Sequence, residues 1–207
     1  VPYRDVGLRF DETMPECDVS FLSYATKLTT NYVSDLSLTV PTSLLECKVL
    51  DHAERIAVSG TDGLTRLDVN NDTVMVTPCP RLRELFWEST TFSPVSAVPF
   101  MAVDQPTLET LSIWADAITP GVEFPASLTA LQMSVRTEPI NIALLSPLTR
   151  LKTLYIRVKN TEEFDLSALH SLTSITANET LVSRLPSSIV EYRVTLQTSL
   201  DLSPYSN

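Results

Sequence analysis

The stretch PASLTALQM, residues 125–133, contains the pattern from which the fold can be predicted. Its Leu128, Leu131 and Met133 are apolar residues at positions i, i+3 and i+5. Four more hexads have this form, again with leucine at the first two positions: Leu64-Leu67-Val69, Leu82-Leu85-Trp87, Leu108-Leu111-Ile113 and Leu151-Leu154-Ile156. The first leucines are spaced 18, 26, 20 and 23 residues apart, so the hexads stay in phase. A unit that recurs at such an interval is typical of a solenoid, in which each coil packs on its neighbours.

Weaker hexads extend the series in both directions. The relaxed matches are Leu44-Cys47-Val49, Leu172-Ile175-Ala177 and Ile189-Tyr192-Val194. Fainter matches near the beginning are Tyr3-Val6-Leu8 and Val19-Leu22-Tyr24, and Val33-Leu36-Leu38 competes with them for the register. We therefore predict a single solenoid over residues 1–207, with irregular or capping repeats at 1–43 and regular repeats at 44–200.

Proline precedes the opening apolar residue of six units by two to four positions. These prolines are Pro41, Pro80, Pro106, Pro125, Pro147 and Pro186. Proline cannot donate to a strand ladder and fixes its own φ angle, so it belongs at the entry of a strand. The prolines therefore predict corners at which the chain returns to the next strand.

The hexads and their prolines resemble the leucine-rich repeat family, and most closely its short-repeat, proline-preceded types in bacterial effectors and protist proteins. The resemblance covers about residues 44–200 and implies a strand-dominated α/β solenoid with a parallel sheet on its concave face. It also implies return segments that are mostly irregular or contain short 3-10 or helical turns. We expect single helical turns at 141–146 and 163–171, and a long irregular return at 89–105.

One position departs from the family pattern. The ninth residue of a family repeat is typically Asn or Cys, whose side chain closes the turn after the strand. In this chain the position holds His52, Asp72, Thr90, Asp116, Arg136, Lys159, Thr180 and Gln197. We expect turns that are looser or closed by other groups.

Composition excludes several functional classes. The net charge of −10 argues against an electrostatic nucleic-acid binder and favours a partner with a basic surface. The four glycines form no phosphate-binding loop, so no nucleotide cofactor is expected, and no apolar run approaches the roughly 18 residues of a membrane span. Three cysteines, at 17, 47 and 79, form no evident disulfide framework, which favours reduced thiols and an intracellular setting.

Residues between the apolar positions of each hexad should point to the opposite, concave face of the sheet. In leucine-rich repeat proteins this face commonly binds protein ligands. Aromatic residues and Arg supply much of the energy of protein interfaces, with charged residues at the rim. We predict a partner-binding patch consisting of Glu84, Phe86, Glu88, Trp114, Gln132, Tyr155 and Arg157. The alternative is that these aromatic side chains pack on one another as ordinary sheet surface.

Candidate catalytic groups are few, and we predict no enzyme activity and no metal or cofactor. Cys47 should point into the core while His52 lies in the turn, so the two diverge. His170 and Asp165 lie in no nucleophile-elbow context. Glu84 and Glu88 have no sugar-binding geometry around them that would suit a glycosidase.

The predicted function is a protein–protein interaction module, and we expect it to be part of a larger protein because neither end shows a polar capping unit. Two alternatives stay open. The chain could be a β-helix-like enzyme acting on polysaccharides, or a structural repeat that associates through its uncapped ends.

Overall fold

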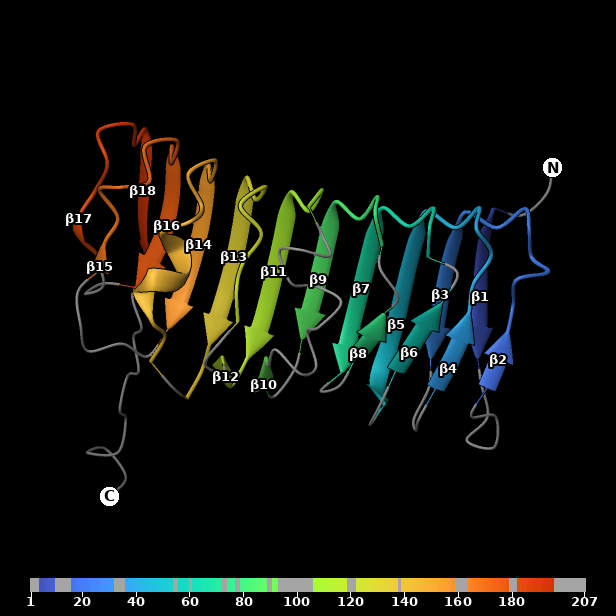
Figure 1. The fold of residues 1–207 in the computed structure, drawn as a ribbon. Coiled ribbons are helices and arrows are strands. Elements are labelled where there is room, and N and C mark those ends of the chain that lie inside the picture. Colours follow the sequence, from blue (N-terminus) through green and yellow to red (C-terminus); the bar gives the residue numbers. More distant parts are fainter. Residues whose placement is uncertain are drawn as a thin grey trace, which may run out of the picture.

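The computed structural model describes most of the chain. The described residues are 4–9, 16–31, 36–53, 56–59, 61–71, 74–76, 79–88, 91–92, 106–118, 122–137, 139–158, 164–178 and 182–195. Within them strands dominate, and the helical element in Figure 1 is the 3-10 turn η2 (Ile142–Leu145). The predicted strand-dominated solenoid is confirmed.

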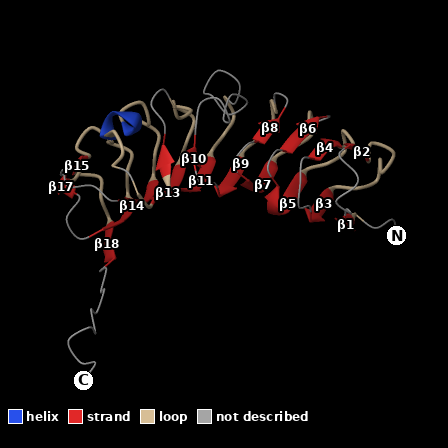
Figure 2. Cartoon of the chain, turned by 90° about the horizontal axis from the view of Figure 1, so that it is seen from below, coloured by secondary structure: helices blue, strands red, loops and turns tan. Residues whose placement is uncertain are grey.

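The main element is a sheet of ten strands that cross the molecule side by side (Figure 1). In spatial order these are β1 (Asp5–Arg9), β3 (Lys27–Asn31), β5 (Glu46–Ala53), β7 (Arg66–Asn71), β9 (Glu84–Glu88), β11 (Thr110–Ala115), β13 (Ala130–Val135), β14 (Thr153–Val158), β16 (Ser174–Asn178) and β18 (Glu191–Thr195). Every neighbouring pair is parallel. Figure 2 shows the chain as an arc, with this sheet along its inner, concave side.

The hexads are the rungs of this sheet. Leu67 pairs with Leu85, and the same register continues through Leu111 and Leu131 to Leu154. All apolar residues of the five strict hexads are buried, with at most 2 % of their surface exposed. Because strand side chains alternate, burying these positions places the intervening residues on the concave face.

The return segments of the N-terminal half differ from our expectation. They contain a second parallel sheet of four strands, β2 (Glu16–Asp18), β4 (Leu36–Thr39), β6 (Ile56–Ser59) and β8 (Val74–Val76). Figure 2 shows these strands on the outer side of the arc. The expected irregular or helical returns are therefore wrong for these coils.

Returns in the C-terminal half contain less regular structure. Two short parallel pairs occur here, β10 (Thr91–Phe92) with β12 (Ala117–Ile118), and β15 (Phe164–Asp165) with β17 (Val182–Arg184). The predicted helical turn at 141–146 is confirmed by η2, which Asn141 caps by accepting from the Ala143 N–H at 2.9 Å. In the segment 163–171 the described residues form β15 and then turns, in which the Leu169 N–H donates to the Leu166 carbonyl at 3.0 Å, so a turn is present but no helix. Most of the return at 89–105 lies outside the described residues.

The first 43 residues contain two ordinary rungs. β1 places Val6 and Leu8 opposite Leu28 and Thr30 of β3, so the faint match at residues 3–8 is in register. The rung in β3 has no counterpart among our hexads, because its inward positions hold the small Ala25 and the polar Thr30.

The two competing matches at the N-terminus lie elsewhere in the coil. Residues 19–24 form a bend between β2 and β3, where Val19 is buried and Tyr24 is exposed. Leu36 and Leu38 belong to β4 of the second sheet. Val19 and Leu38 therefore contribute to the core from the return side rather than from the concave sheet.

The predicted corners at prolines are present as turns. Backbone carbonyls of Pro41 and Pro125 accept from the N–H groups of Leu44 and Leu128 at 3.0 and 3.1 Å. At Gly63, which precedes Leu64 in the neighbouring coil, a Cβ atom would overlap the Thr42 carbonyl oxygen. Successive corners therefore stack closely.

Hydroxyl groups join the corners into a ladder. The residue before the opening apolar position donates to the carbonyl of the preceding coil's opening residue: Ser43 to Ala25 at 2.9 Å, Thr107 to Leu82 at 2.9 Å, Ser127 to Leu108 at 2.6 Å and Ser188 to Leu172 at 2.6 Å. A second set follows the opening position: Thr26 to Arg4, Thr65 to Leu45, Thr129 to Glu109 and Thr173 to Lys152. These bonds satisfy carbonyl groups at the corners that they reach.

At the ninth position of the repeat, side chains other than Asn or Cys close the turn after the strand in the described residues. Arg136 and Asp116, which occupy this position in successive coils, form an ion pair with 2.8 Å between Nε and Oδ1. The Thr137 hydroxyl also donates to the Asp116 carbonyl at 2.7 Å. His52 lies within β5 rather than in a turn, which corrects its predicted place. The remaining ninth-position residues, Asp72, Thr90, Lys159, Thr180 and Gln197, lie outside the described residues.

Candidate functional site

All seven predicted patch residues lie on the concave face of the large sheet. They come from four successive strands, β9, β11, β13 and β14. Two rows of paired residues cross these strands. One row is Phe86, Ser112, Gln132 and Tyr155, and the next is Glu88, Trp114, Ser134 and Arg157.

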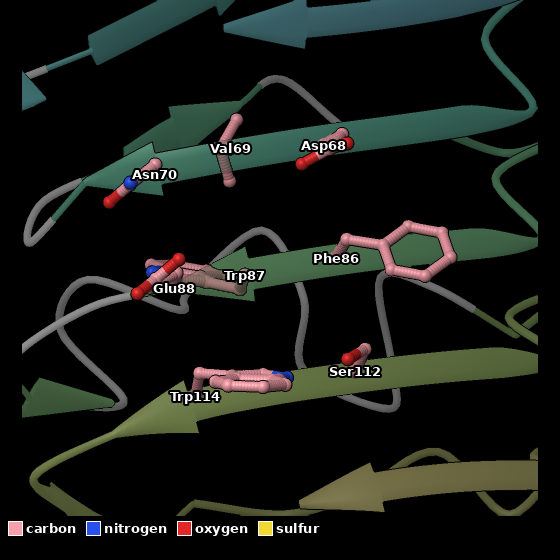
Figure 3. Close-up of a pocket in the computed structure, with 8 residues that line it drawn as sticks. All are labelled: Asp68, Val69, Asn70, Phe86, Trp87, Glu88, Ser112 and Trp114. Atoms are coloured by element: carbon pink, nitrogen blue, oxygen red, sulfur yellow. The ribbon is translucent and has the colours of Figure 1, made fainter. Parts of the chain in front are cut away.

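Part of the patch lines a shallow hollow of about 180 Å³ that opens to solvent. Its walls come from the neighbouring strands β7, β9 and β11 (Figure 3). The lining residues are Asp68, Val69, Asn70, Phe86, Trp87, Glu88, Ser112 and Trp114. The patch and the hollow thus share Phe86, Glu88 and Trp114, and Asp68, Asn70 and Ser112 are additions that our patch omitted.

One side of the hollow is occupied by contacts within the protein. The Arg66 guanidinium lies over the Phe86 ring, with 4.4 Å from its carbon to the ring centroid. The same guanidinium bonds the Glu84 carboxylate, with 2.9 Å between Nη1 and Oε2. Glu84 was predicted as a charged rim residue, yet its charge is balanced by Arg66.

The other side of the hollow holds Trp114 and Glu88, which pair directly between β11 and β9. Trp114 keeps 47 % of its surface exposed, although its strand neighbours Ile113 and Ala115 are fully buried. The residue across from Trp114 on β13 is the small Ser134, which leaves that flank of the indole uncovered. Within the part of the chain that the structure describes, Glu88 forms no ion pair.

Gln132, Tyr155 and Arg157 share the face but not the hollow. Tyr155 lies three strands from Phe86, which corresponds to about 14 Å at a strand spacing near 4.8 Å. The aromatic side chains therefore do not form the single mid-stack cluster that we predicted from the sequence. Phe86 and Trp114 share one hollow, and Tyr155 lies apart, beside Gln132 and Thr176.

A ladder of ion pairs covers the N-terminal part of the same face, and our sequence analysis missed it. Lys27 pairs with Glu46 at 3.0 Å, Arg66 with Glu84 at 2.9 Å, and Lys48 with Asp68 at 3.1 Å. The sequence contained a signal for this ladder: equivalent positions of successive strands are occupied by residues of alternating charge, Asp5, Lys27, Glu46, Arg66 and Glu84. Opposite charges at equivalent positions of adjacent coils predict such pairs.

Among the groups that we weighed as catalytic candidates, the structure describes the side chains of Cys47, Asp165 and His170. Burial raises the pKa of the Cys47 thiol to about 12 and that of Cys79 to about 11, so both thiols are neutral at physiological pH. His170 is exposed in a turn, and Asp165 accepts from the Ser167 N–H at 2.9 Å, which lowers the pKa of Asp165. Among the described residues no group of three or more His, Cys, Asp or Glu side chains could hold a metal ion.

Comparisons with models of known protein families, with curated proteins and with solved structures find no match for this chain. In the described part of the chain, no helix has the length and apolar character needed to span a membrane.

Proposed function

We propose that the chain is a protein-binding module whose partner occupies the concave face around Trp114. The observation that carries this proposal is the half-exposed indole at the edge of a hollow, on a sheet whose inward side is fully packed. Trp is among the residues that most often dominate protein interfaces. An aromatic residue that is left exposed on a rigid sheet suits recognition better than packing.

Rigidity supports the proposal as well. Trp114 and Glu88 extend from neighbouring strands whose inward residues Trp87 and Ile113 are at most 1 % exposed. Their backbone positions are therefore held by the core, and binding would order few additional groups. A repeat stack of this kind offers an extended concave surface.

We also propose that the coil is a variant of the leucine-rich repeat, on the basis of its hexads and its concave parallel sheet. The hydroxyl ladder and the Asp116–Arg136 ion pair then replace the family's Asn ladder. The second sheet in the N-terminal half is the feature that fits a β-helix equally well.

Because the second sheet resembles that of a β-helix, an enzyme acting on polysaccharides is the second candidate function. Against it, Glu84 is bound to Arg66, and Glu46 and Asp68 on the N-terminal part of the face form ion pairs with Lys27 and Lys48. Incubation with acidic polysaccharides, followed by analysis of reducing ends, tests this candidate directly. Release of new reducing ends would replace the binding-module proposal.

The test of the binding module is a double variant, Phe86→Ala with Trp114→Ala. We expect loss of capture of the partner that is identified by cross-linking and mass spectrometry, with little change in melting temperature because neither ring belongs to the core. Tyr24→Ala is the matched control, since Tyr24 is also 47 % exposed but lies in a return segment. Unchanged capture by the double variant would refute the proposed surface.

A further inference from the structure

The hollow on the concave face contains two aromatic rings with different surroundings. Phe86 is covered by the Arg66 guanidinium at 4.4 Å, and this cation also bonds Glu84 at 2.9 Å. The group thus combines an aromatic ring, a carboxylate and a cation. A cation over an aromatic face is attracted by the ring's quadrupole, and a carboxylate adds a charge-assisted hydrogen bond.

Trp114 and Glu88 provide the same ring and carboxylate without a cation. Their strands pair at this position, and Figure 3 shows both side chains at the same end of the hollow. Neither side chain forms an ion pair or cation–π contact within the described residues. Indole is the ring that attracts cations most strongly.

Other charged groups near Trp114 do not supply the missing cation. Asp68, on the far wall, is bound to Lys48 at 3.1 Å. Arg157 lies on β14, two strands from Trp114, with Ser134 between them. The net charge of the chain is −10, and Glu88 has no ion-pair partner among the described residues, so a positive ligand is favoured.

Resting on the proposed binding function, we propose that this end of the hollow receives a Lys or Arg side chain of the protein partner. The cationic head lies against the Trp114 indole and bonds the Glu88 carboxylate. The partner's cation would then lie between an aromatic ring and a carboxylate, as Arg66 does between Phe86 and Glu84. Charge complementarity selects this occupant over an apolar or acidic segment.

The test uses the full chain and two capped peptides of equal length, hexa-arginine and its neutral isostere hexa-citrulline. Trp114 reports binding, because Trp87 is 1 % exposed and its emission monitors only the folded core. We expect hexa-arginine, and not hexa-citrulline, to change the Trp114 emission. Glu88→Gln should weaken hexa-arginine binding about tenfold, as expected for losing one charge-assisted contact.

Glu123→Gln is the matched control, because it removes the same charge from an exposed return segment. We expect it to change the affinity by less than about twofold, since distant exposed charges are screened. Equal binding of both peptides, or equal effects of the two Glu→Gln variants, would overturn the inference. A response of Trp114 to cellohexaose but not to hexa-arginine would also overturn it, in favour of a neutral sugar.

Failure here and failure of the binding function are distinguishable. If the peptides do not bind but Phe86→Ala with Trp114→Ala still abolishes partner capture, only the cationic occupant is wrong. If partner capture survives that double variant, the surface itself is wrong.

Discussion

The two halves of the solenoid close the same kind of coil in different ways. From β1 to β8 each return contributes a strand, and a second parallel sheet covers the core. From β9 onward the described parts of the returns contain turns, short strand pairs and the 3-10 turn η2. The concave face also differs: ion pairs join neighbouring strands in its N-terminal part, whereas the aromatic Trp114 and Tyr155 lie on β11 and β14.

The difference follows from the return sequences. Residues 36–39 (LSLT) and 56–59 (IAVS) alternate large apolar residues with small ones, which suits a strand buried on one face, and Leu38 and Val58 are buried. In the C-terminal half, prolines such as Pro139 and Pro147 interrupt the returns and cannot donate to a ladder. The core can therefore be covered by either type of return, provided that apolar side chains such as Phe124 and Leu145 reach it.

The largest expected effect tests whether the second sheet holds the N-terminal half together. Val58→Pro removes an N–H from β6, which lies between β4 and β8, and should lower the free energy of unfolding by about 3 kcal/mol or more. Ala126→Pro, in an exposed C-terminal corner, should change it by less than about 0.5 kcal/mol. Urea denaturation followed by circular dichroism measures the unfolding free energy of both variants. Equal losses of unfolding free energy would contradict the difference between the two halves.

A second prediction uses the buried thiols, both of which lie in the N-terminal half. The native pKa values of Cys47 and Cys79 are raised to about 12 and about 11 from 9.0. Above pH 9 the unfolded chain loses these protons while the native chain retains them, so stability should fall as pH rises from 9 towards 11 or 12. The slope is at most about 1.4 kcal/mol per pH unit for each thiol.

Cys47→Ala should flatten this alkaline decline, measured by urea denaturation between pH 8 and 11. Cys17→Ala serves as the control, because Cys17 is only half-buried. If Cys47→Ala leaves the alkaline fall in stability unchanged, the pKa of the Cys47 thiol is not raised in the native state.

The smallest expected effect concerns the ion-pair ladder. Lys27→Gln removes the partner of Glu46, but both side chains are about half exposed. Exposed pairs of this kind contribute about 0.2–1 kcal/mol, and salt screens them. The decrease in unfolding free energy caused by Lys27→Gln should therefore be smaller in 1 M NaCl. A loss above about 2 kcal/mol would mean that the ladder, and not the second sheet, stabilises the N-terminal half.

Much of the architecture could be predicted from the sequence, because the Leu-rich hexads have a strict phase and bury completely. The rung at Ala25, Leu28 and Thr30 could not, since a small and a polar residue occupy its inward positions. The Thr30 hydroxyl is buried without a hydrogen-bond partner among the described residues, which is costly and therefore unexpected. The second sheet was missed because four-residue apolar runs do not distinguish a strand from other buried segments.

The candidate site was predicted in part. The alternation within each hexad placed Phe86, Glu88 and Trp114 correctly on the concave face. It did not show that Arg66 would cover Phe86 and bind Glu84, because these contacts depend on the register between coils 18 residues apart. Comparing equivalent positions of successive units would have exposed the pairing of opposite charges.

The hydroxyl ladder bears on how this chain can vary. Each Ser or Thr of the ladder fixes the start of one strand against the start of the preceding one, as Ser127 does with Leu108. Alignment between coils is therefore set at a single corner, and the rest of the coil is free to change in length. The 26-residue unit between Leu82 and Leu108 is aligned in this way, by Thr107 and the Leu82 carbonyl. Insertions should be tolerated on the outer rim, whereas a one-residue shift at a corner would misalign every rung beyond it.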